Sequence, residues 1–294
     1  MTPLRLFWWA PGRNLRLAWP EAKTNPGVWI RLGLRTGRIA TNFGDELSSH
    51  VVEAVTRRQV QWAEPRSAEL VAIGSVLGLY AAMGSGAAVW GTGIREPISP
   101  GEAELLKGRL GPILAVRGNH TRDALGLPSS TALGDAGMLA PMFASRSTLR
   151  KKGVLAIPHF RAWSSRSGRE TVKQLTKVDI DIAEPTLHPR AMIERISNSS
   201  LVLTSSLHGL ILGHSLGVPT QLVSWDGEAD QEPDFKYADY FSSVGHEVSR
   251  LPIQLALEES KINEIHQNCE GLVKVLEKKT STLAEHLVKA IEGF

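Results

Sequence analysis

The sequence predicts an α/β protein made of two similar units, each a parallel β-sheet covered by helices, that face one cleft. From about residue 40 onward, short apolar and β-branched runs alternate with stretches of helical periodicity, which is typical of parallel sheets. A polar, basic stretch without periodicity interrupts this alternation over residues 142–152, and the pattern then starts again. With 294 residues, the chain is long enough for two cores of about 150 residues each.

The same pattern predicts the order of the elements. In the first unit we expect strands near residues 60–63, 70–76, 87–91 and 113–117, and helices near residues 46–58, 101–108 and 119–126. In the second unit we expect strands near residues 153–157, 178–182, 201–204 and 220–224, and helices near residues 167–176, 189–197, 208–216 and 235–243. This order predicts Rossmann-like domains over residues 1–145 and 150–250 and a helical tail over residues 251–294.

The two ends of the chain depart from this alternation. The first forty residues carry seven arginine or lysine side chains against one acidic residue, Glu21, together with four tryptophans. We expect a twisted hairpin with packed tryptophans and solvated arginines; a surface for an anionic glycan, a phosphate or a membrane is the alternative. From Pro252 onward, apolar residues recur at steps of three, four and seven, which predicts one or two amphipathic helices packed on the body. Whether this tail also forms a homo-oligomer is left open.

Composition excludes several classes of protein. The chain has one cysteine, Cys269, so it forms neither an intramolecular disulfide nor a cysteine-based metal cluster. No apolar run reaches the roughly 18 residues of a membrane span, and the N-terminus lacks a signal-peptide core. We therefore expect a cytoplasmic protein, with contact at the inner face of the membrane left open. No segment fits a P-loop, a dinucleotide site or a His-Glu-x-x-His metal site, and nucleic-acid binding has no support beyond the basic N-terminus.

The segment over residues 201–214 carries the strongest functional signal. There a buried strand runs into a polar turn, and His208 stands in the first turn of an apolar helix, at the sheet edge where open α/β proteins bind ligands. Backbone N–H groups at a helix start attract anions, and Ser205 and Ser206 offer hydroxyls at the same place. A histidine there can transfer a proton near neutral pH, because its unperturbed pKa is about 6.5. The alternative is that His208 only caps the helix or binds a buried carbonyl group.

Several short segments share their content and order with one known family. Thr204-Ser-Ser-Leu-His-Gly-Leu-Ile, with Ser215-Leu-Gly-Val-Pro-Thr after it, resembles the signature segment of polysaccharide pyruvyl transferases. Asn42-Phe-Gly-Asp-Glu-Leu resembles the opening loop of that family, Val116-Arg-Gly-Asn-His its arginine-centred loop, and Gly134-Asp-Ala-Gly the stretch that follows. Segments 157–160 and 235–240 are also similar, so the resemblance covers roughly residues 4–246.

The resemblance implies a fold similar to GT-B glycosyltransferases and a reaction in which phosphoenolpyruvate, bound in the cleft, forms a pyruvate ketal on a sugar. It implies that no metal or organic cofactor is needed. The key histidine of the family corresponds to His208, and its donor-binding arginine to Arg117. Many members have Arg-Leu before the histidine, whereas this chain has Ser206-Leu207. One phosphate or carboxylate contact must therefore come from elsewhere, and the candidates are Lys236, His159 and Arg122.

The charges of phosphoenolpyruvate favour Arg117 independently of the resemblance. The molecule carries a carboxylate and a phosphate, and guanidinium groups bind such oxyanions bidentately. Arg117 follows a predicted strand, which places it at the cleft; a salt bridge to Asp123 or Asp135 is the alternative. The helix start that includes Leu207 and Gly209 is expected to help neutralise the leaving phosphate.

Further candidates lie at other strand ends and turns. Asp45, beside Gly44, is expected to align the acceptor hydroxyls, with Asn42 binding substrate in the same loop; capping of the following helix is the alternative for Asp45. His159 ends the first strand of the second unit and is assigned to substrate binding. Asp135, with glycines close on either side, is either ligand-facing or a turn residue.

Two other functions fit the same expectations. A GT-B glycosyltransferase that uses a nucleotide sugar needs a carboxylate in the second unit to hold the ribose, and Asp226 and Glu228 lie just beyond the signature region. A non-catalytic glycan- or anion-binding protein of the same fold is the other alternative. The leading interpretation has phosphoenolpyruvate and a sugar or lipid-linked oligosaccharide as partners, with Lys236 either contacting phosphate or merely solvated.

Overall fold

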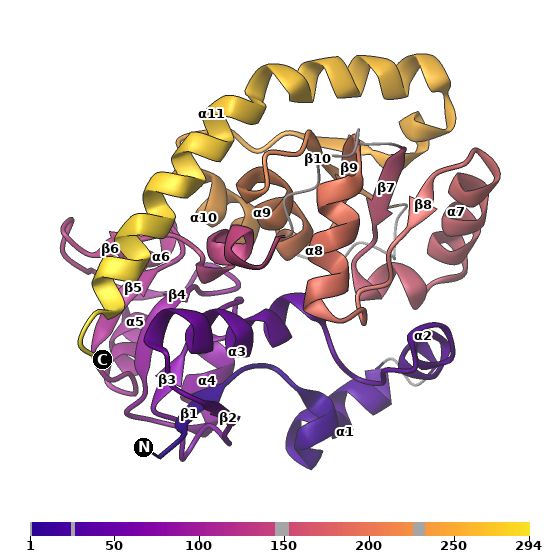
Figure 1. Ribbon diagram of the computed structural model, residues 1–294. Helices are drawn as coiled ribbons and strands as arrows, with labels where there is room; N and C mark the ends of the chain where they lie inside the picture. The colour runs from indigo at the N-terminus through magenta and orange to yellow at the C-terminus, as the bar shows by residue number, and fades with distance from the viewer. Residues whose placement is uncertain (1, 25–26, 145–152, 226–232) are drawn as a thin grey trace.

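The chain folds around two parallel β-sheets with helices packed against them, as the computed structural model shows (Figure 1). The structure describes residues 2–24, 27–144, 153–225 and 233–294, so most of the predicted linker and both Asp226 and Glu228 lie outside the described residues. The first sheet has the strand order β2-β1-β3-β4-β5-β6 and the second β11-β10-β9-β7-β8, and the described pairings are parallel. The prediction of an α/β protein with parallel sheets is confirmed.

Each predicted strand and helix overlaps an observed one. The strands of the first sheet are β1 (Leu4–Phe7), β2 (Val60–Trp62), β3 (Leu70–Val71), β4 (Ala88–Thr92), β5 (Ile113–Val116) and β6 (Ala132–Leu133). Helices α3 (Phe43–Thr56), α4 (Leu77–Met83), α5 (Pro100–Lys107), α6 (Asn119–Ala124) and the 3-10 helix η2 (Ala136–Phe143) accompany them. The strands of the second sheet are β7 (Val154–Ile157), β8 (Asp181–Ile182), β9 (Leu201–Thr204), β10 (Thr220–Ser224) and β11 (Arg250–Pro252). They are accompanied by η3 (Phe160–Trp163), α7 (Arg166–Lys177), α8 (Pro189–Asn198), α9 (Leu207–Ser215) and α10 (Asp234–Val244).

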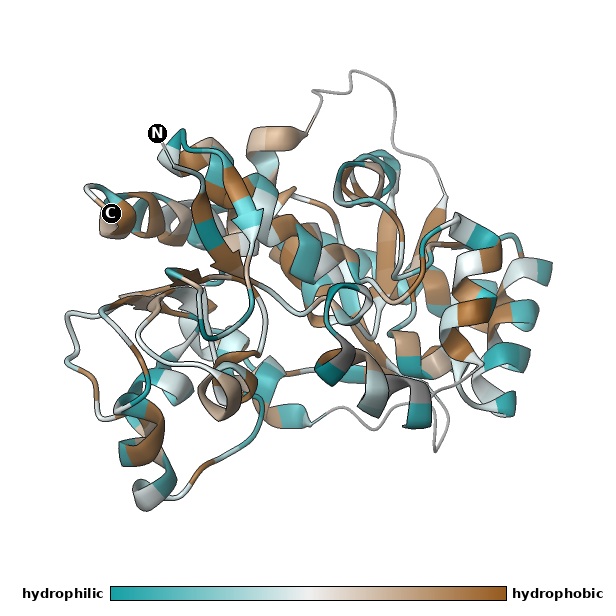
Figure 2. Ribbon diagram, turned by 90° about the horizontal axis from the view of Figure 1, so that it is seen from below, coloured by the Kyte–Doolittle hydropathy of each residue, from teal (hydrophilic) through white to brown (hydrophobic). Residues whose placement is uncertain are grey.

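Strands in the interior of the sheets, such as β4 and β9, are buried along their whole length because helices cover both of their faces. All four residues of β9 are buried, for example. Figure 2 shows the strands mostly in brown, whereas the helices alternate between brown and teal along their length. Continuous apolar strands and amphipathic helices are what a parallel sheet between helices requires. One cluster of buried side chains joins Leu6 and Ile73 from the first half of the chain to Ile157 and Val202 from the second, so the two sheets share a core.

The N-terminal segment does not form the predicted hairpin. Residues 4–7 form β1, which pairs in parallel with β2 and β3 in the interior of the first sheet. The chain then continues into helices α1 (Leu15–Thr24) and α2 (Val28–Thr36). The prediction was wrong because a run of four residues with one exposed position fits an interior strand as well as a hairpin arm. Of the tryptophans, Trp8 and Trp29 are buried, whereas Trp19 is 74% exposed.

The predicted helical tail begins with the end of β11 and the 3-10 helix η5 (Ile253–Leu257), and the rest is one long helix, α11 (Glu259–Ile291). It runs along both sheets (Figure 1), with Cys269 packed in the core of the second sheet and Leu287 and Ile291 in the shared core. The indole N–H of Trp90 donates a hydrogen bond of 2.9 Å to the carbonyl of Leu287. Much of the apolar stripe of α11 is therefore buried within the chain. Among the described residues, no helix combines the length and apolarity needed to cross a membrane.

Candidate active site

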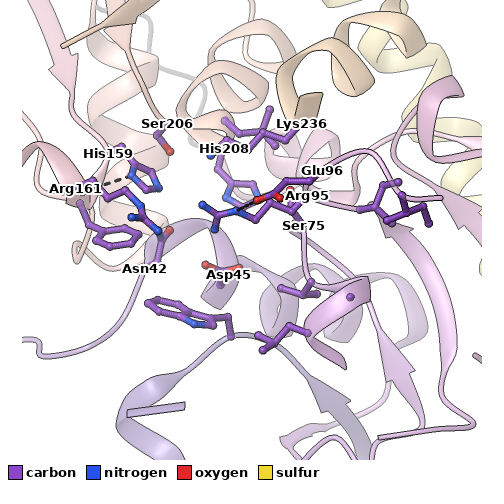
Figure 3. A pocket seen from close by; sticks show the side chains of 18 of the residues that line it. Asn42, Asp45, Ser75, Arg95, Glu96, His159, Arg161, Ser206, His208 and Lys236 are labelled. Atoms are coloured by element: carbon purple, nitrogen blue, oxygen red, sulfur yellow. Dashed lines mark hydrogen bonds and ion pairs between the residues drawn. The ribbon is translucent and has the colours of Figure 1, made fainter. Parts of the chain in front are cut away.

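One cavity lies between the two sheets, at the carboxyl ends of strands from both. Its volume is about 570 Å³, within the range of small-molecule sites. Trp9, Ser75 and Arg95 reach it from beyond β1, β3 and β4, while His159 and Ser206 reach it from beyond β7 and β9. Ligands of open parallel sheets bind at this edge. The polar side chains that line the cavity are those of Asn42, Asp45, Ser75, Arg95, Glu96, His159, Arg161, Ser206, His208 and Lys236 (Figure 3).

The start of α3 brings the first half of the chain against the second. Asn42 caps this helix, because its Oδ1 accepts a hydrogen bond of 2.9 Å from the backbone N–H of Gly44. Capping, which the sequence left open as a role for Asp45, is thus performed by Asn42. A Cβ atom on Gly44 would collide with the imidazole of His208, so only glycine lets the loop approach the histidine this closely. The predicted loop and the predicted histidine therefore meet.

Asp45 is a buried carboxyl group in the first turn of α3. Its Oδ1 lies 2.9 Å from the point where a Cβ atom on Gly74 would stand, and Gly74 has a φ of 102° that side chains rarely adopt. Burial raises the pKa of Asp45 to about 8. The charge of Lys236 opposes this rise, whereas those of Asp135 and Glu46 add to it. Asp45 is therefore a neutral acid at pH 7.

His208 stands in the first turn of α9 with its imidazole buried. Ser206 caps the helix, its Oγ accepting a hydrogen bond of 3.4 Å from the backbone N–H of Gly209, so His208 itself is not the cap. The Nε2 of His208 is buried and has no hydrogen-bond partner among the described residues. Burial, together with the charges of Lys236 and Arg117, lowers the pKa of His208 to about 3. The imidazole is therefore neutral at pH 7.

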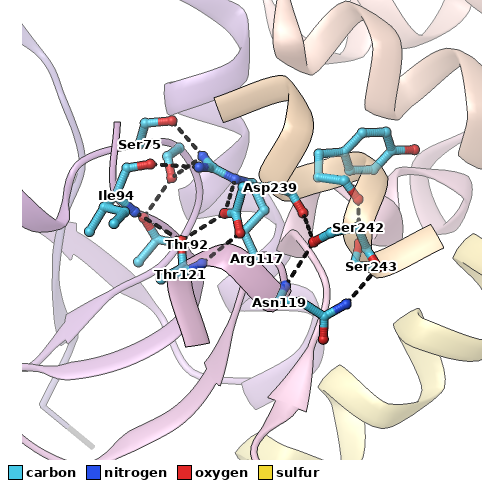
Figure 4. A network of polar contacts seen from close by, with 11 residues as sticks. Ser75, Thr92, Ile94, Arg117, Asn119, Thr121, Asp239, Ser242 and Ser243 are labelled. Atoms are coloured by element: carbon cyan, nitrogen blue, oxygen red, sulfur yellow. Dashed lines mark hydrogen bonds and ion pairs between the residues drawn. The ribbon is translucent and has the colours of Figure 1, made fainter. Parts of the chain in front are cut away.

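Arg117 does not line the cavity and is instead part of a network of polar contacts (Figure 4). Its side chain has no exposed surface, and its Nε forms an ion pair with Asp239 Oδ2 at 2.9 Å. Its terminal nitrogens donate hydrogen bonds to the carbonyl of Ile94, at 2.7 Å, and to Ser75 Oγ. The partner is thus neither of the aspartates considered from the sequence. This arrangement does not support a direct contact between Arg117 and a ligand.

The Arg117–Asp239 pair connects three segments that line the cavity: the turns after β3 and β4 and helix α10. Asp239 also accepts hydrogen bonds from the backbone N–H of Thr121, at 2.8 Å, and from its hydroxyl, at 2.7 Å. Ser75 and Ile94, which Arg117 holds, line the cavity, and α10, which carries Asp239, also carries the lining residue Lys236. Arg117 therefore holds residues that line the cavity in place and does not itself line the cavity.

A family comparison agrees with this geometry. The model of the polysaccharide pyruvyl transferase family matches residues 42–227, more than half of the chain, and the match includes both the α3 loop and the His208 turn. The chain belongs to this family. An uncharacterised protein of Acanthamoeba polyphaga mimivirus is 32% identical to this pyruvyl transferase family member over 124 residues. The aligned part is 40% of this chain and 42% of the viral protein, so the chain spans less than half the length of that relative.

In this pyruvyl transferase family member, three more of the predicted site residues line the cavity. His159 accepts a hydrogen bond of 3.4 Å from the backbone N–H of Arg161 at its Nδ1, and its ring lies 4.3 Å from that of Phe160 between centroids. Lys236 is buried, with its Nζ 4.9 Å from the ring centroid of Tyr237. The third residue, Leu207, follows the cap of α9.

Other predicted residues lie behind the cavity and support it. Ser205 Oγ accepts a hydrogen bond of 2.9 Å from the backbone N–H of His159. Gly209 packs so closely on Thr204 that a Cβ atom would collide with the hydroxyl. Asp135 caps η2 and is a turn residue, and burial raises its pKa to about 7. Arg122, a suggested phosphate ligand, instead forms an ion pair of 3.2 Å with Asp123.

Two arginines that the sequence analysis did not single out line the cavity. Arg95 follows β4, with its Nε 3.6 Å from Glu96 Oε1, and Arg161 follows β7, with its guanidinium carbon 5.5 Å from the ring centroid of Phe160. Both stand only a few residues beyond a strand end, which is the signal that could have identified them. Together with Lys236, they are the lysine and arginine side chains that line the cavity in the described part of the chain.

Proposed function

We propose that the chain transfers the enolpyruvyl carbons of phosphoenolpyruvate onto two hydroxyls of a sugar, forming a pyruvate ketal and releasing phosphate. One observation carries the proposal: a neutral buried imidazole, a neutral buried carboxyl group and cationic side chains share one cavity. These groups belong to His208, Asp45, Arg95, Arg161 and Lys236. Membership of the pyruvyl transferase family supports the same class of reaction.

The charges of the cavity suit a small dianion. Phosphoenolpyruvate brings a carboxylate and a phosphate, whose oxygens bind to cationic groups and to backbone N–H groups. Lys236 is close enough to influence His208 electrostatically, so its ammonium group and the start of α9 can act on one phosphate. Glu96 is paired with Arg95, and Asp45 is neutral at pH 7. Among the described residues, the charged side chains that line the cavity are therefore mostly cationic, which suits this donor.

The protonation states divide the catalytic work between Asp45 and His208. Asp45 gives its proton to the methylene carbon of phosphoenolpyruvate, which becomes a methyl group beside an oxocarbenium-like carbon. One sugar hydroxyl attacks that carbon and passes its proton to Nε2 of His208. The second hydroxyl then attacks the same carbon, the bond to phosphate breaks, and phosphate leaves with the second hydroxyl proton. The proton on His208 restores Asp45, so the step balances as donor plus diol giving ketal plus phosphate.

This scheme gives Asp45 the role of acid, beyond the alignment of hydroxyls expected from the sequence. A cavity between the carboxyl ends of two parallel sheets also supports a GT-B-like arrangement of the predicted domains over residues 1–145 and 150–250. The acidic side chains that line the cavity, among the described residues, are Asp45 and Glu96, both from the first half of the chain. A nucleotide sugar needs a carboxylate from the second half, and the candidates for that role, Asp226 and Glu228, lie outside the described residues.

Calorimetric titration with phosphoenolpyruvate and, separately, with a uridine diphosphate sugar tests the donor. We expect the first to bind and the second not to bind. Phosphate release should require a glycoside with two free neighbouring hydroxyls, and mass spectrometry should detect the ketal. Lys236→Met should weaken phosphoenolpyruvate binding about tenfold or more, whereas Lys173→Met, on an exposed side chain paired with Glu170, should not.

Binding of the nucleotide sugar without binding of phosphoenolpyruvate would overturn the proposal in favour of a glycosyltransferase. Phosphoenolpyruvate binding without phosphate release, over a broad panel of acceptors, would instead support the non-catalytic anion-binding alternative.

A further inference from the structure

We propose that the wall of the cavity formed by Trp9, Phe160 and Arg161 is an acceptor subsite, in which one face of a pyranose ring packs on the indole of Trp9. The inference rests on the proposed function and adds the residues that select the acceptor. Trp9 is half-buried and lines the cavity. Its ring centroid lies 5.8 Å from that of Trp29 and 6.1 Å from that of Phe160, and these two are 5.2 Å apart.

The rings of Trp29 and Phe160, which belong to different elements, pack against Trp9 and hold its indole in a fixed orientation. Trp9 follows β1, Trp29 belongs to α2, and Phe160 begins η3 in the other half of the chain. Trp29 and Phe160 are buried at 5% and 7% exposure, so Trp9 is the member of the three with surface left for a ligand. A ring that is already ordered loses little conformational entropy when a ligand packs on it.

A sugar ring matches the chemistry of this wall. It presents a face of C–H groups that packs on an aromatic ring and a rim of hydroxyls that needs hydrogen-bond partners. Within the described part of the chain, the indole N–H of Trp9 and the Nδ2 of Asn42 have no hydrogen-bond partner, since Asn42 uses its Oδ1 for Gly44. Phosphoenolpyruvate has no comparable apolar face, so the donor is served better by the cations.

The proposed subsite and Lys236 lie on different sides of Asp45 and His208. Figure 3 shows Asn42 and Arg161 toward one end of the cavity, Lys236 toward the other, and Asp45 and His208 between them. A donor held by Lys236 and a sugar held at the Trp9 wall would bring their reacting atoms together beside Asp45 and His208. We infer that the acceptor is a pyranose that stacks through one face and presents two of its hydroxyls to these groups.

Trp9→Leu and Trp9→Phe form a matched pair, because both keep an apolar side chain and only phenylalanine keeps a ring. With phosphoenolpyruvate and p-nitrophenyl glycosides as substrates, we expect Trp9→Leu to raise the acceptor KM about tenfold or more while the phosphoenolpyruvate KM stays within about twofold. Trp9→Phe should restore most of the acceptor affinity. Trp19→Leu, at a side chain that is 74% exposed on α1, is the control and should change neither KM.

Saturation-transfer NMR with the glycosides alone supplies a readout that does not depend on turnover. The wild-type protein should transfer saturation mainly to the protons of one face of the sugar ring, and Trp9→Leu should lose this preference. An unchanged acceptor KM in Trp9→Leu would overturn the subsite, and so would an equal rise in both KM values, which indicates a merely structural tryptophan. If phosphoenolpyruvate fails to bind while the face-specific transfer persists, the proposed reaction falls and the sugar subsite stands.

Discussion

The turn after β5 and the turn after β9 look alike in the sequence, yet they do different things in the structure. Each follows a buried parallel strand, opens a helix and carries a side chain expected to meet the ligand, Arg117 in one and His208 in the other. Arg117 is enclosed and bonded to Asp239, Ser75 and Ile94. His208 instead lines the cavity, with an Nε2 that has no partner among the described residues.

The difference comes from what the rest of the chain places opposite each turn. Helix α10 covers the β5 turn and sets the carboxylate of Asp239 against Arg117, whereas the β9 turn faces Gly44, which has no side chain to occupy the space. A cation at a strand end can bind a ligand when no other group neutralises it. When a buried carboxylate pairs with it, the cation has a structural role instead. The two turns can therefore be separated by experiment.

The largest effect is expected at the β9 turn. His208→Asn should lower phosphate release from phosphoenolpyruvate about 10²–10⁴-fold, because it removes the proposed base. The free energy of unfolding should change little, since the imidazole Nε2 has no hydrogen bond to lose among the described residues. Initial rates and urea unfolding together measure both quantities.

His214 provides a matched control within the same helix. Its pKa is also lowered to about 3 by burial, but its Nδ1 is hydrogen-bonded to Tyr240 at 2.8 Å and it does not line the cavity. His214→Asn should lower stability and leave the turnover number largely intact. Equal loss of turnover in both variants would contradict a specific role for His208.

At the β5 turn the main effect should be on stability. Arg117→Met leaves the buried carboxylate of Asp239 without its cation and should lower the free energy of unfolding by about 3–5 kcal/mol. The double variant Arg117→Met/Asp239→Asn should recover part of this loss. Arg122→Met, in the helix α6 that follows this turn and with an exposed partner, should cost less than about 1 kcal/mol in urea unfolding. Unchanged stability with a strongly raised phosphoenolpyruvate KM would show that Arg117 does touch the donor.

The smallest effect is expected on the pH dependence of stability and concerns Asp45. This residue follows Gly44, which lies against the β9 turn. Its pKa is about 8 in the fold against an ordinary value of 3.8, so between these values the folded state binds more protons than the unfolded state. This group therefore makes the free energy of unfolding fall as pH rises through that window. Relative to Asp45→Asn, the wild type should lose on the order of 1–2 kcal/mol between pH 6.5 and 8. A pH-independent difference between the two urea curves would show that Asp45 is ionised in the fold.

Short sequence segments were sufficient to identify many residues of the candidate site. The turn that contains His208 was identified because a buried strand runs there into a polar turn and the start of a helix, and the loop that contains Asn42 and Asp45 because it resembles the opening loop of the family. Arg95 and Arg161 stand a few residues past a strand end, which favours a site at that edge, but they were missed because this position does not show which way a side chain points. The role of Arg117 was misjudged for a related reason: its partner is 122 residues away in the chain.

The alternation of apolar runs and helical stretches by itself determined that this chain forms parallel sheets covered by helices. A strand that is buried on both faces is an almost continuous apolar run, and such a run can be recognised in the sequence. The sequence also determined that a histidine and a carboxyl group stand at helix starts. Only the tertiary structure decided that these two groups share a cavity, that β1 lies inside a sheet and that the most prominent arginine is neutralised. The physical reason is that charge neutralisation and close packing depend on which distant element arrives opposite a given side chain, and no local pattern encodes that.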